Sequence, residues 1–205
     1  MQNSQENQLQ VYQLAASDIE EAASLLANAF MDYPLHQYLF QSDWHKVDKF
    51  FQWYFQCLLK SFFKGAKIIC IGKPIRGVCV YSLPESPDVT LWKFFKSGFY
   101  KLPFKVSIDS MKRLICVNNA FKQYKTLSHE RIVHVDILAV DPKYQGYGFG
   151  KQLFHHIIKQ PDYKYLIVTH KIANVQFYEK MGCKLIKVEQ LQQSTVESFF
   201  MSYDS

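Results

Sequence analysis

Three glycines at alternate positions, Gly146, Gly148 and Gly150, are the residues whose spacing most clearly indicates a binding chemistry. An alternating apolar run over 132–140 precedes them, and a run with helical spacing begins at Lys151. The sequence therefore predicts a strand, a tight turn and a helix N-terminus in succession. The first N–H groups of a helix have no partner within the helix, and glycine lets an anion approach the backbone closely. We therefore expect a phosphate-binding turn here.

The spacing of this turn excludes two common nucleotide motifs. A P-loop would need a glycine where Gln145 stands and a hydroxyl side chain where Gln152 stands. The dinucleotide pattern G-x-G-x-x-G fails because its last glycine would fall on Lys151 or Leu153. The phosphate is therefore expected to belong to another class of ligand.

Two titratable side chains, His134 and Asp136, lie on the strand that leads into the turn. Strict alternation puts them on one face with Ile132, Leu138 and Val140, and it makes the opposite face uniformly apolar, from Val133 through Val135 and Ile137 to Ala139. A buried carboxylate is costly unless it is paired. The pair could therefore supply a general base or a purely structural contact, and the sequence leaves both alternatives open. Glu130 is a weaker candidate for the same role.

The elements that must position these residues follow from periodicity, capping residues and breakers. The order indicates a mixed α/β fold that forms a single domain over 9–205, after a polar N-terminal tail at 1–8. The predicted strands are 9–14, 67–71, 77–83, 132–140, 165–169, 184–188 and 198–203. The predicted helices are 17–30, 43–63, two within 90–125 that break near Pro103, 151–159 and 174–181.

Two segments in the last third of the chain resemble motifs of the GNAT superfamily of N-acetyltransferases. Gln145-x-x-Gly148-x-Gly150, after Leu138-Ala139-Val140-Asp141-Pro142, resembles the acyl-CoA-binding motif, and residues 174–183 resemble the later helix of the family. The N-terminal portion matches loosely. The aromatic middle and Leu83-Pro84 resemble the puromycin-acetyltransferase-like branch.

The resemblance implies a single-domain GNAT-like α/β fold with a mixed, mostly antiparallel twisted sheet flanked by helices, and an acyl-CoA-binding core over 132–188. It implies acetyl-CoA as cosubstrate and direct attack by a primary amine. Tyr178 would protonate the departing thiolate, and Asp136 or His134 would take the amine proton. A backbone N–H near Leu138 would stabilise the oxyanion. The implied cofactor-binding residues are Leu138, Ala139, Val140, Gln145, Gly146, Tyr147, Gly148, Phe149, Gly150, Lys151, Asn174 and Tyr178.

Composition sets broad limits on these expectations. No apolar run is long enough to cross a bilayer, and five cysteines without a C-x-x-C pair indicate a reduced, cytoplasmic protein. No metal site is expected, because the adjacent His155 and His156 lack the spacing of a zinc pair. The expected oligomeric state is monomer or homodimer.

The net charge of +6 is concentrated in one aromatic segment. Between Thr90 and Lys125 there are eight basic residues and one acid, Asp109, which gives +7 for this stretch. Such a segment could bind nucleic acid or a membrane surface. We instead expect an amphipathic helical segment with its aromatics buried and its lysines in water, so that no membrane partner and no nucleic acid are predicted.

The acceptor is predicted to be a small-molecule amine, selected by residues from 30–40 and 90–125. Two alternatives remain: a non-catalytic CoA-binding or nucleic-acid-associated protein with this fold, and an acetyltransferase that acts on a protein N-terminus or lysine.

Overall fold

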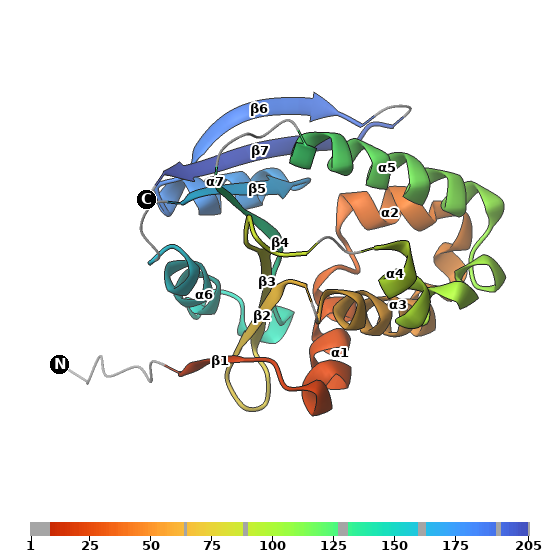
Figure 1. The fold of residues 1–205 in the computed structure, drawn as a ribbon, viewed down its shortest axis with the longest axis horizontal. Helices are drawn as coiled ribbons and strands as arrows, with labels where there is room; N and C mark the ends of the chain where they lie inside the picture. Colours follow the sequence, from red (N-terminus) through yellow and green to blue (C-terminus); the bar gives the residue numbers. More distant parts are fainter. Residues whose placement is uncertain are drawn as a thin grey trace.

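The computed structural model describes residues 9–63, 65–87, 90–126, 131–159, 163–191 and 194–204. The predicted tail at 1–8 and Glu130 lie outside these residues. One 7-stranded sheet, ordered β1-β2-β3-β4-β5-β7-β6, forms the centre (Figure 1). Only β4 and β5 pair in parallel, so the predicted mixed and mostly antiparallel α/β fold is confirmed. The strands are β1 Val11–Gln13, β2 Lys67–Ile71, β3 Gly77–Ser82, β4 Ile132–Val140, β5 Lys164–Thr169, β6 Lys184–Gln190 and β7 Glu197–Asp204.

Helices cover both faces of the sheet, with α1 to α5 on one side and α6 and α7 on the other (Figure 1). The helices are α1 Ile19–Ala29, α2 Pro34–Phe40, α3 Val47–Phe62, α4 Leu91–Lys96, α5 Ile108–Thr126, α6 Phe149–Ile157 and α7 Ile172–Lys180, with short 3-10 helices η1 Ala16–Asp18, η2 Gln41–Lys46, η3 Phe99–Phe104 and η4 Pro142–Tyr144. No helix in the described ranges is both long and apolar enough to cross a membrane.

Helical spacing of apolar residues explains how the helices on the α1 to α5 side of the sheet pack together. Ala22, Ala23 and Leu26 of α1 lie within one turn and are fully buried against α3, where Phe51 and Leu59 are equally buried. No helix is predicted between residues 30 and 43, but α2 lies in this stretch. Pro34 is the first residue of α2, a position where its missing N–H removes no helical hydrogen bond.

On the other side of the sheet, α6 packs through its predicted apolar stripe. Leu153, Phe154 and Ile157 are buried there, together with Val175 and Tyr178 of α7. Both helices begin two residues earlier than predicted, α6 at Phe149 and α7 at Ile172. The sheet therefore has a separate hydrophobic core on each face.

The basic aromatic segment has the predicted secondary structure but not the predicted orientation. Two helices flank η3, which contains Pro103, as expected. The expectation that its aromatics point inward is wrong for four residues that are exposed: Trp92, Phe95, Tyr100 and Phe104. The helices α4 and η3 have six residues each, and α4 packs against α3, so rings that point away from α3 remain in water.

A buried carboxylate fixes the start of α5. Asp43 of η2 accepts hydrogen bonds from Ser107 N (2.8 Å), Ser107 Oγ (2.9 Å) and Ser110 Oγ (2.7 Å). Burial acts to raise the pKa of Asp43, but these hydrogen bonds outweigh it and hold the pKa below its ordinary value. Asp43 therefore joins η2 to α5 as a charged acceptor.

We expect Asp43→Ala to lower the free energy of unfolding by about 2–4 kcal/mol, because it leaves the buried Ser110 hydroxyl without its acceptor. The folded pKa lies below the unfolded one, so this contribution is present above about pH 4 and is lost as the pH falls through the folded pKa. Urea denaturation at neutral and acid pH measures both effects. Asp48→Ala, at an exposed position of α3, is the matched control. Equal losses in the two variants would contradict the assignment.

Candidate functional site

The parallel strands β4 and β5 diverge halfway along their length. Their pairing runs from Ile132 with Lys164 to Val135 with Ile167, although β4 continues to Val140. Beyond the last pair, the two strands offer no partner to each other, so the backbone of β4 is open to a ligand on that side. The predicted cofactor-binding residues Leu138, Ala139 and Val140 all lie on this open portion.

A β-bulge at Asp136 marks the point of divergence. Val135 pairs with Tyr81 and Ile137 pairs with Val80, so Asp136 is an extra residue between them. After the bulge, the odd-numbered side chains point to the face of the sheet opposite the one they point to before it. Val133 and Val135 pack in the core under α6 and α7, whereas Ile137 and Ala139 pack in the core under α1 and α3. The prediction of one uniform apolar face along the strand is therefore wrong, because it assumed unbroken alternation.

The structure brings His134 and Asp136 together around Ser82 of β3. Ser82 is the cross-strand partner of His134, and its hydroxyl donates a 2.6 Å hydrogen bond to Asp136 Oδ2. Ser82 was not predicted, because its position opposite His134 depends on the register of two strands far apart in the sequence.

The glycine turn has the backbone conformation of an anion cradle. Gly146 and Gly148 have φ of 86° and 81°, in the left-handed region, although an added Cβ would meet no atom within 4 Å at either position. Glycine is therefore required by conformation and not by space. The first helical hydrogen bond runs from Gln152 N to Gly148 O. In the described part of the chain, the N–H groups of 146–150 donate to no other backbone group.

Side chains around the turn hold it to the sheet. Gln145 Nε2 donates to Val140 O (3.3 Å), and Tyr147 and Lys151 are exposed beside the glycines. Arg76, just before β3, was not predicted. Its guanidinium lies 4.9 Å from the ring centre of Tyr144 and 5.6 Å from that of Phe149, which places a positive charge beside the start of α6.

Tyr178 is buried in α7, with its ring centre 5.6 Å from that of Phe154. Burial raises its pKa well above the ordinary value, and Cys79, Tyr33 and Cys183 add to this effect. The phenol therefore keeps its proton at neutral pH.

A hydrogen-bond network that was not predicted joins the end of β5 to the linker before α2. Tyr33 Oη accepts from His170 N (2.8 Å) and lies 3.1 Å from Thr169 Oγ1. Asn174 Nδ2 donates to the same threonine oxygen (2.9 Å), which fixes this predicted site residue at the start of α7.

Two buried histidines lie beside this network. Burial lowers the pKa of His36 to about 3, with a contribution from His170, and lowers the pKa of His170 to about 4. Both imidazoles are therefore neutral at physiological pH. No group of three or more His, Cys, Asp or Glu side chains that could hold a metal occurs in the described ranges. The five cysteines are free, and Cys116 alone among them is exposed.

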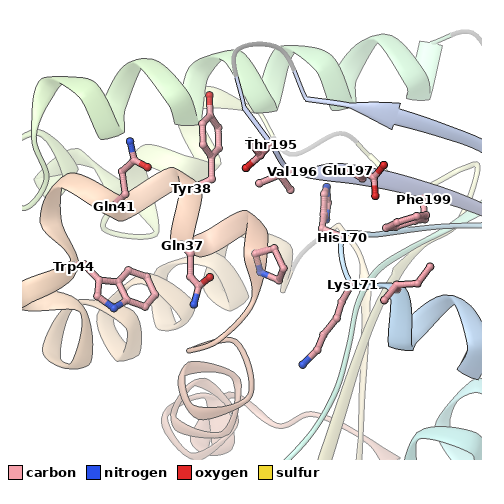
Figure 2. A pocket seen from close by; sticks show the side chains of 12 residues that line it. Gln37, Tyr38, Gln41, Trp44, His170, Lys171, Thr195, Val196, Glu197 and Phe199 are labelled. Carbon is pink, nitrogen blue, oxygen red and sulfur yellow. The ribbon is translucent and has the colours of Figure 1, made fainter.

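A pocket of about 800 Å³ opens beside the end of β5 (Figure 2). Pro34, Gln37 and Tyr38 line part of it, whereas 90–125 supply none of its lining side chains among the described residues. Figure 2 shows Trp44 and Gln41 at one end and His170, Glu197 and Phe199 at the other. The lining residues are Pro34, Gln37, Tyr38, Gln41, Trp44, His170, Lys171, Ile172, Thr195, Val196, Glu197 and Phe199.

Comparisons with known proteins agree with this arrangement. Residues 109–203 match the family model of the acetyltransferase (GNAT) domain. No curated protein sequence matches the chain.

Several solved structures share the fold at low sequence identity. A protein described as histone acetyltransferase HPA2 and related acetyltransferase, from Corynebacterium glutamicum, is 15% identical with a TM-score of 0.67, and the match covers 96% of each chain. The ribosomal-protein-S18-alanine N-acetyltransferase of Escherichia coli is 13% identical (TM-score 0.55, 94% of this chain and 91% of that one). Arabidopsis thaliana NAA60, solved in complex with acetyl-CoA, is 13% identical (TM-score 0.52, 95% and 97%).

The likeness to these structures establishes the fold, and the family model covers the strands and helices that carry the glycine turn and Tyr178. Residues 109–203 therefore match the model of a GNAT acetyltransferase domain, and the chain has the fold of the acetyltransferase structures named above.

Proposed function

We propose that this protein is an acetyl-CoA-dependent N-acetyltransferase that moves the acetyl group to a primary amine within a ternary complex. One observation carries the proposal. The open backbone of β4 ends at Val140, and the N–H groups of 146–150, which donate to no backbone group, follow a few residues later, so a single extended ligand can use both. A phosphate at the turn with a peptide-like arm along the strand is the chemistry of an acyl-CoA.

The donor is held by the backbone more than by side chains. N–H groups over 145–150 bind the pyrophosphate, with Lys151 and Arg76 adding positive charge nearby. The main chain of 138–140 pairs with the amides of the pantetheine arm as an added strand would. NAA60, which has this fold, binds acetyl-CoA. The thioester then lies beside the bulge at Asp136.

The reaction needs two proton transfers and one oxyanion site. The amine nitrogen forms a bond to the acetyl carbon while the carbon–sulfur bond breaks. Asp136 or His134 accepts the proton from nitrogen, and Tyr178 gives its proton to the departing thiolate. A backbone N–H near Leu138 stabilises the negative charge that develops on the carbonyl oxygen. Asn174, fixed by Thr169, helps to place the cofactor.

The pocket in Figure 2 is the proposed acceptor site. It includes α2 and the end of β5, so the amine approaches from the helical layer opposite α6, which carries the phosphate. Glu197, the acid among the described lining residues, attracts an ammonium group, and Trp44 and Phe199 provide flat apolar walls. We therefore propose a small amine with an aromatic or aliphatic body as acceptor.

Amine-stimulated release of free thiol from acetyl-CoA tests this function. We expect phenethylamine to stimulate release more than propylamine, because its ring fills the apolar part of the pocket, by about tenfold or more in kcat/KM. A peptide with a free N-terminus serves as a third acceptor. Preference for the peptide would support the alternative of a protein acetyltransferase. Binding of acetyl-CoA without release by any of the three amines would indicate a non-catalytic protein and would overturn the proposal.

The turn is tested by Gly148→Ala. Alanine at φ 81° costs about 1–2 kcal/mol and distorts the cradle, so the Kd for acetyl-CoA should rise about tenfold or more. Isothermal titration calorimetry measures this change. Gly182→Ala is the matched control, because Gly182 has φ 88° but lies after α7, away from the turn. An unchanged Kd in Gly148→Ala would remove the turn from the donor site.

Tyr178→Phe separates catalysis from binding. The loss of a proton donor should lower kcat about 100-fold while the Kd for acetyl-CoA changes less than about twofold. Tyr203→Phe is the control, since Tyr203 also contacts Phe154 in the same core. If kcat at saturating amine is the same in Tyr178→Phe and wild type, another group protonates the thiolate.

A further inference from the structure

A set of exposed apolar side chains lies outside the site described above. Trp92 is 63% exposed, Phe95 54%, Tyr100 48%, Phe104 91% and Ile108 75%. They come from α4, η3 and the first residue of α5. Single exposed apolar side chains are common on protein surfaces, but here five large ones occur within 17 consecutive residues. Clusters of this kind mark interaction sites. With Lys96 and Lys101 they form what we name the aromatic–lysine surface.

Three of the rings contact one another in series on this surface, the first pair stacked and the second tilted by 42°. The ring centres of Trp92 and Phe95 are 5.8 Å apart with planes only 2° from parallel, and those of Phe95 and Tyr100 are 5.3 Å apart. Lys96 Nζ lies 5.1 Å from the ring centre of Trp92, and Lys101 Nζ lies 5.5 Å from that of Tyr100. Each of these rings thus has a neighbouring ring or lysine against part of its surface.

This packing argues against nucleic acid as the occupant. Single-stranded nucleic acid binds aromatic side chains by stacking bases on open ring faces. On the aromatic–lysine surface a lysine already lies over Trp92 and another over Tyr100, and the exposed Ile108 has no ring on which a base could stack.

Charge argues against a second copy of the chain. In a symmetric dimer the same patch meets itself, so the two copies of Lys96 and Lys101 would face each other. The whole stretch from Thr90 to Lys125 carries +7, with Asp109 as its single acid. Two such stretches repel.

The interleaving of lysine with aromatic residues also differs from a protein interface. The centre of a protein–protein interface is depleted of lysine, which is confined to the rim. Here lysines alternate with the rings along the segment. Segments that lie on a membrane combine Trp and Phe, which enter the headgroup region, with lysines that contact lipid phosphates.

We propose that the aromatic–lysine surface docks the protein onto a membrane that contains anionic lipid. Phe104, Trp92 and Ile108 enter the boundary between headgroups and acyl chains, while Lys96 and Lys101 contact the phosphates. This interfacial docking differs from the expectation of no membrane partner. That expectation assumed buried aromatics in this segment, and the structure shows four of them exposed.

Vesicle sedimentation tests the proposal with the full chain. We expect binding to vesicles of phosphatidylcholine mixed with phosphatidylserine, and at least tenfold weaker binding to phosphatidylcholine alone, because each lysine near an anionic surface adds to the attraction. Binding should weaken with added salt. Phe104→Ser and Lys96→Glu should each reduce binding to the mixed vesicles by about fivefold or more.

Ile186→Ser is the matched control, since Ile186 is 58% exposed but belongs to the edge strand β6 and not to α4, η3 or α5. Circular dichroism confirms that each variant is folded, and Phe104 is so exposed that its replacement costs little stability. Equal binding by Phe104→Ser and Ile186→Ser, or no binding to the mixed vesicles, would overturn the proposal. So would a dimer in sedimentation equilibrium, or binding to single-stranded DNA, that Phe104→Ser abolishes.

Discussion

The divergence of β4 from β5 is the constraint on which the rest of the structure depends. A parallel pair normally continues along the shared length of its strands, but here the extra residue Asp136 interrupts β4 where the pairing with β5 ends. The same residue turns the second half of β4 toward the opposite core, so Ile137 packs under α1 while Leu138 packs toward α6. One inserted residue thus opens the sheet, exposes backbone groups to a ligand and places a carboxylate at the mouth of the opening.

An open sheet must be held apart by packing on both faces. Val133 and Val135 are anchored under α6 and α7, and Ile137 and Ala139 under α1 and α3. Each half of β4 is therefore fixed by a different layer. The network from Tyr33 through Thr169 to Asn174 ties the diverging end of β5 to both layers, because Tyr33 precedes α2 and Asn174 belongs to α7. These hydrogen bonds preserve the separation that backbone pairing would otherwise close.

Features that depend on local pattern could be predicted from the sequence, whereas features that depend on register could not. The strand at 132–140, the glycine turn and the stripe of α6 follow from alternation, conformational preference and helical spacing, and the structure has them. Ser82, Arg76 and the bulge depend on how β3 aligns with β4, which no local pattern encodes. His170 and Tyr33 meet across more than a hundred residues. The exposed rings near Trp92 show that apolar character alone does not indicate burial.

The helix α5 connects the proposed acceptor pocket to the aromatic–lysine surface. Arg113 donates to Tyr38 O (3.2 Å), and its guanidinium lies over the Tyr38 ring. The Gln41 amide is oriented so that its oxygen accepts a 2.7 Å hydrogen bond from Arg113. The NH₂ group of Gln41 therefore points away from the guanidinium. The same helix starts at Ile108, within the surface, and is fixed by Asp43 through Ser107 and Ser110. One rigid element thus sets both the end wall of the pocket and the proposed docking face, so a docked molecule holds its acceptor pocket at a fixed orientation to the lipid.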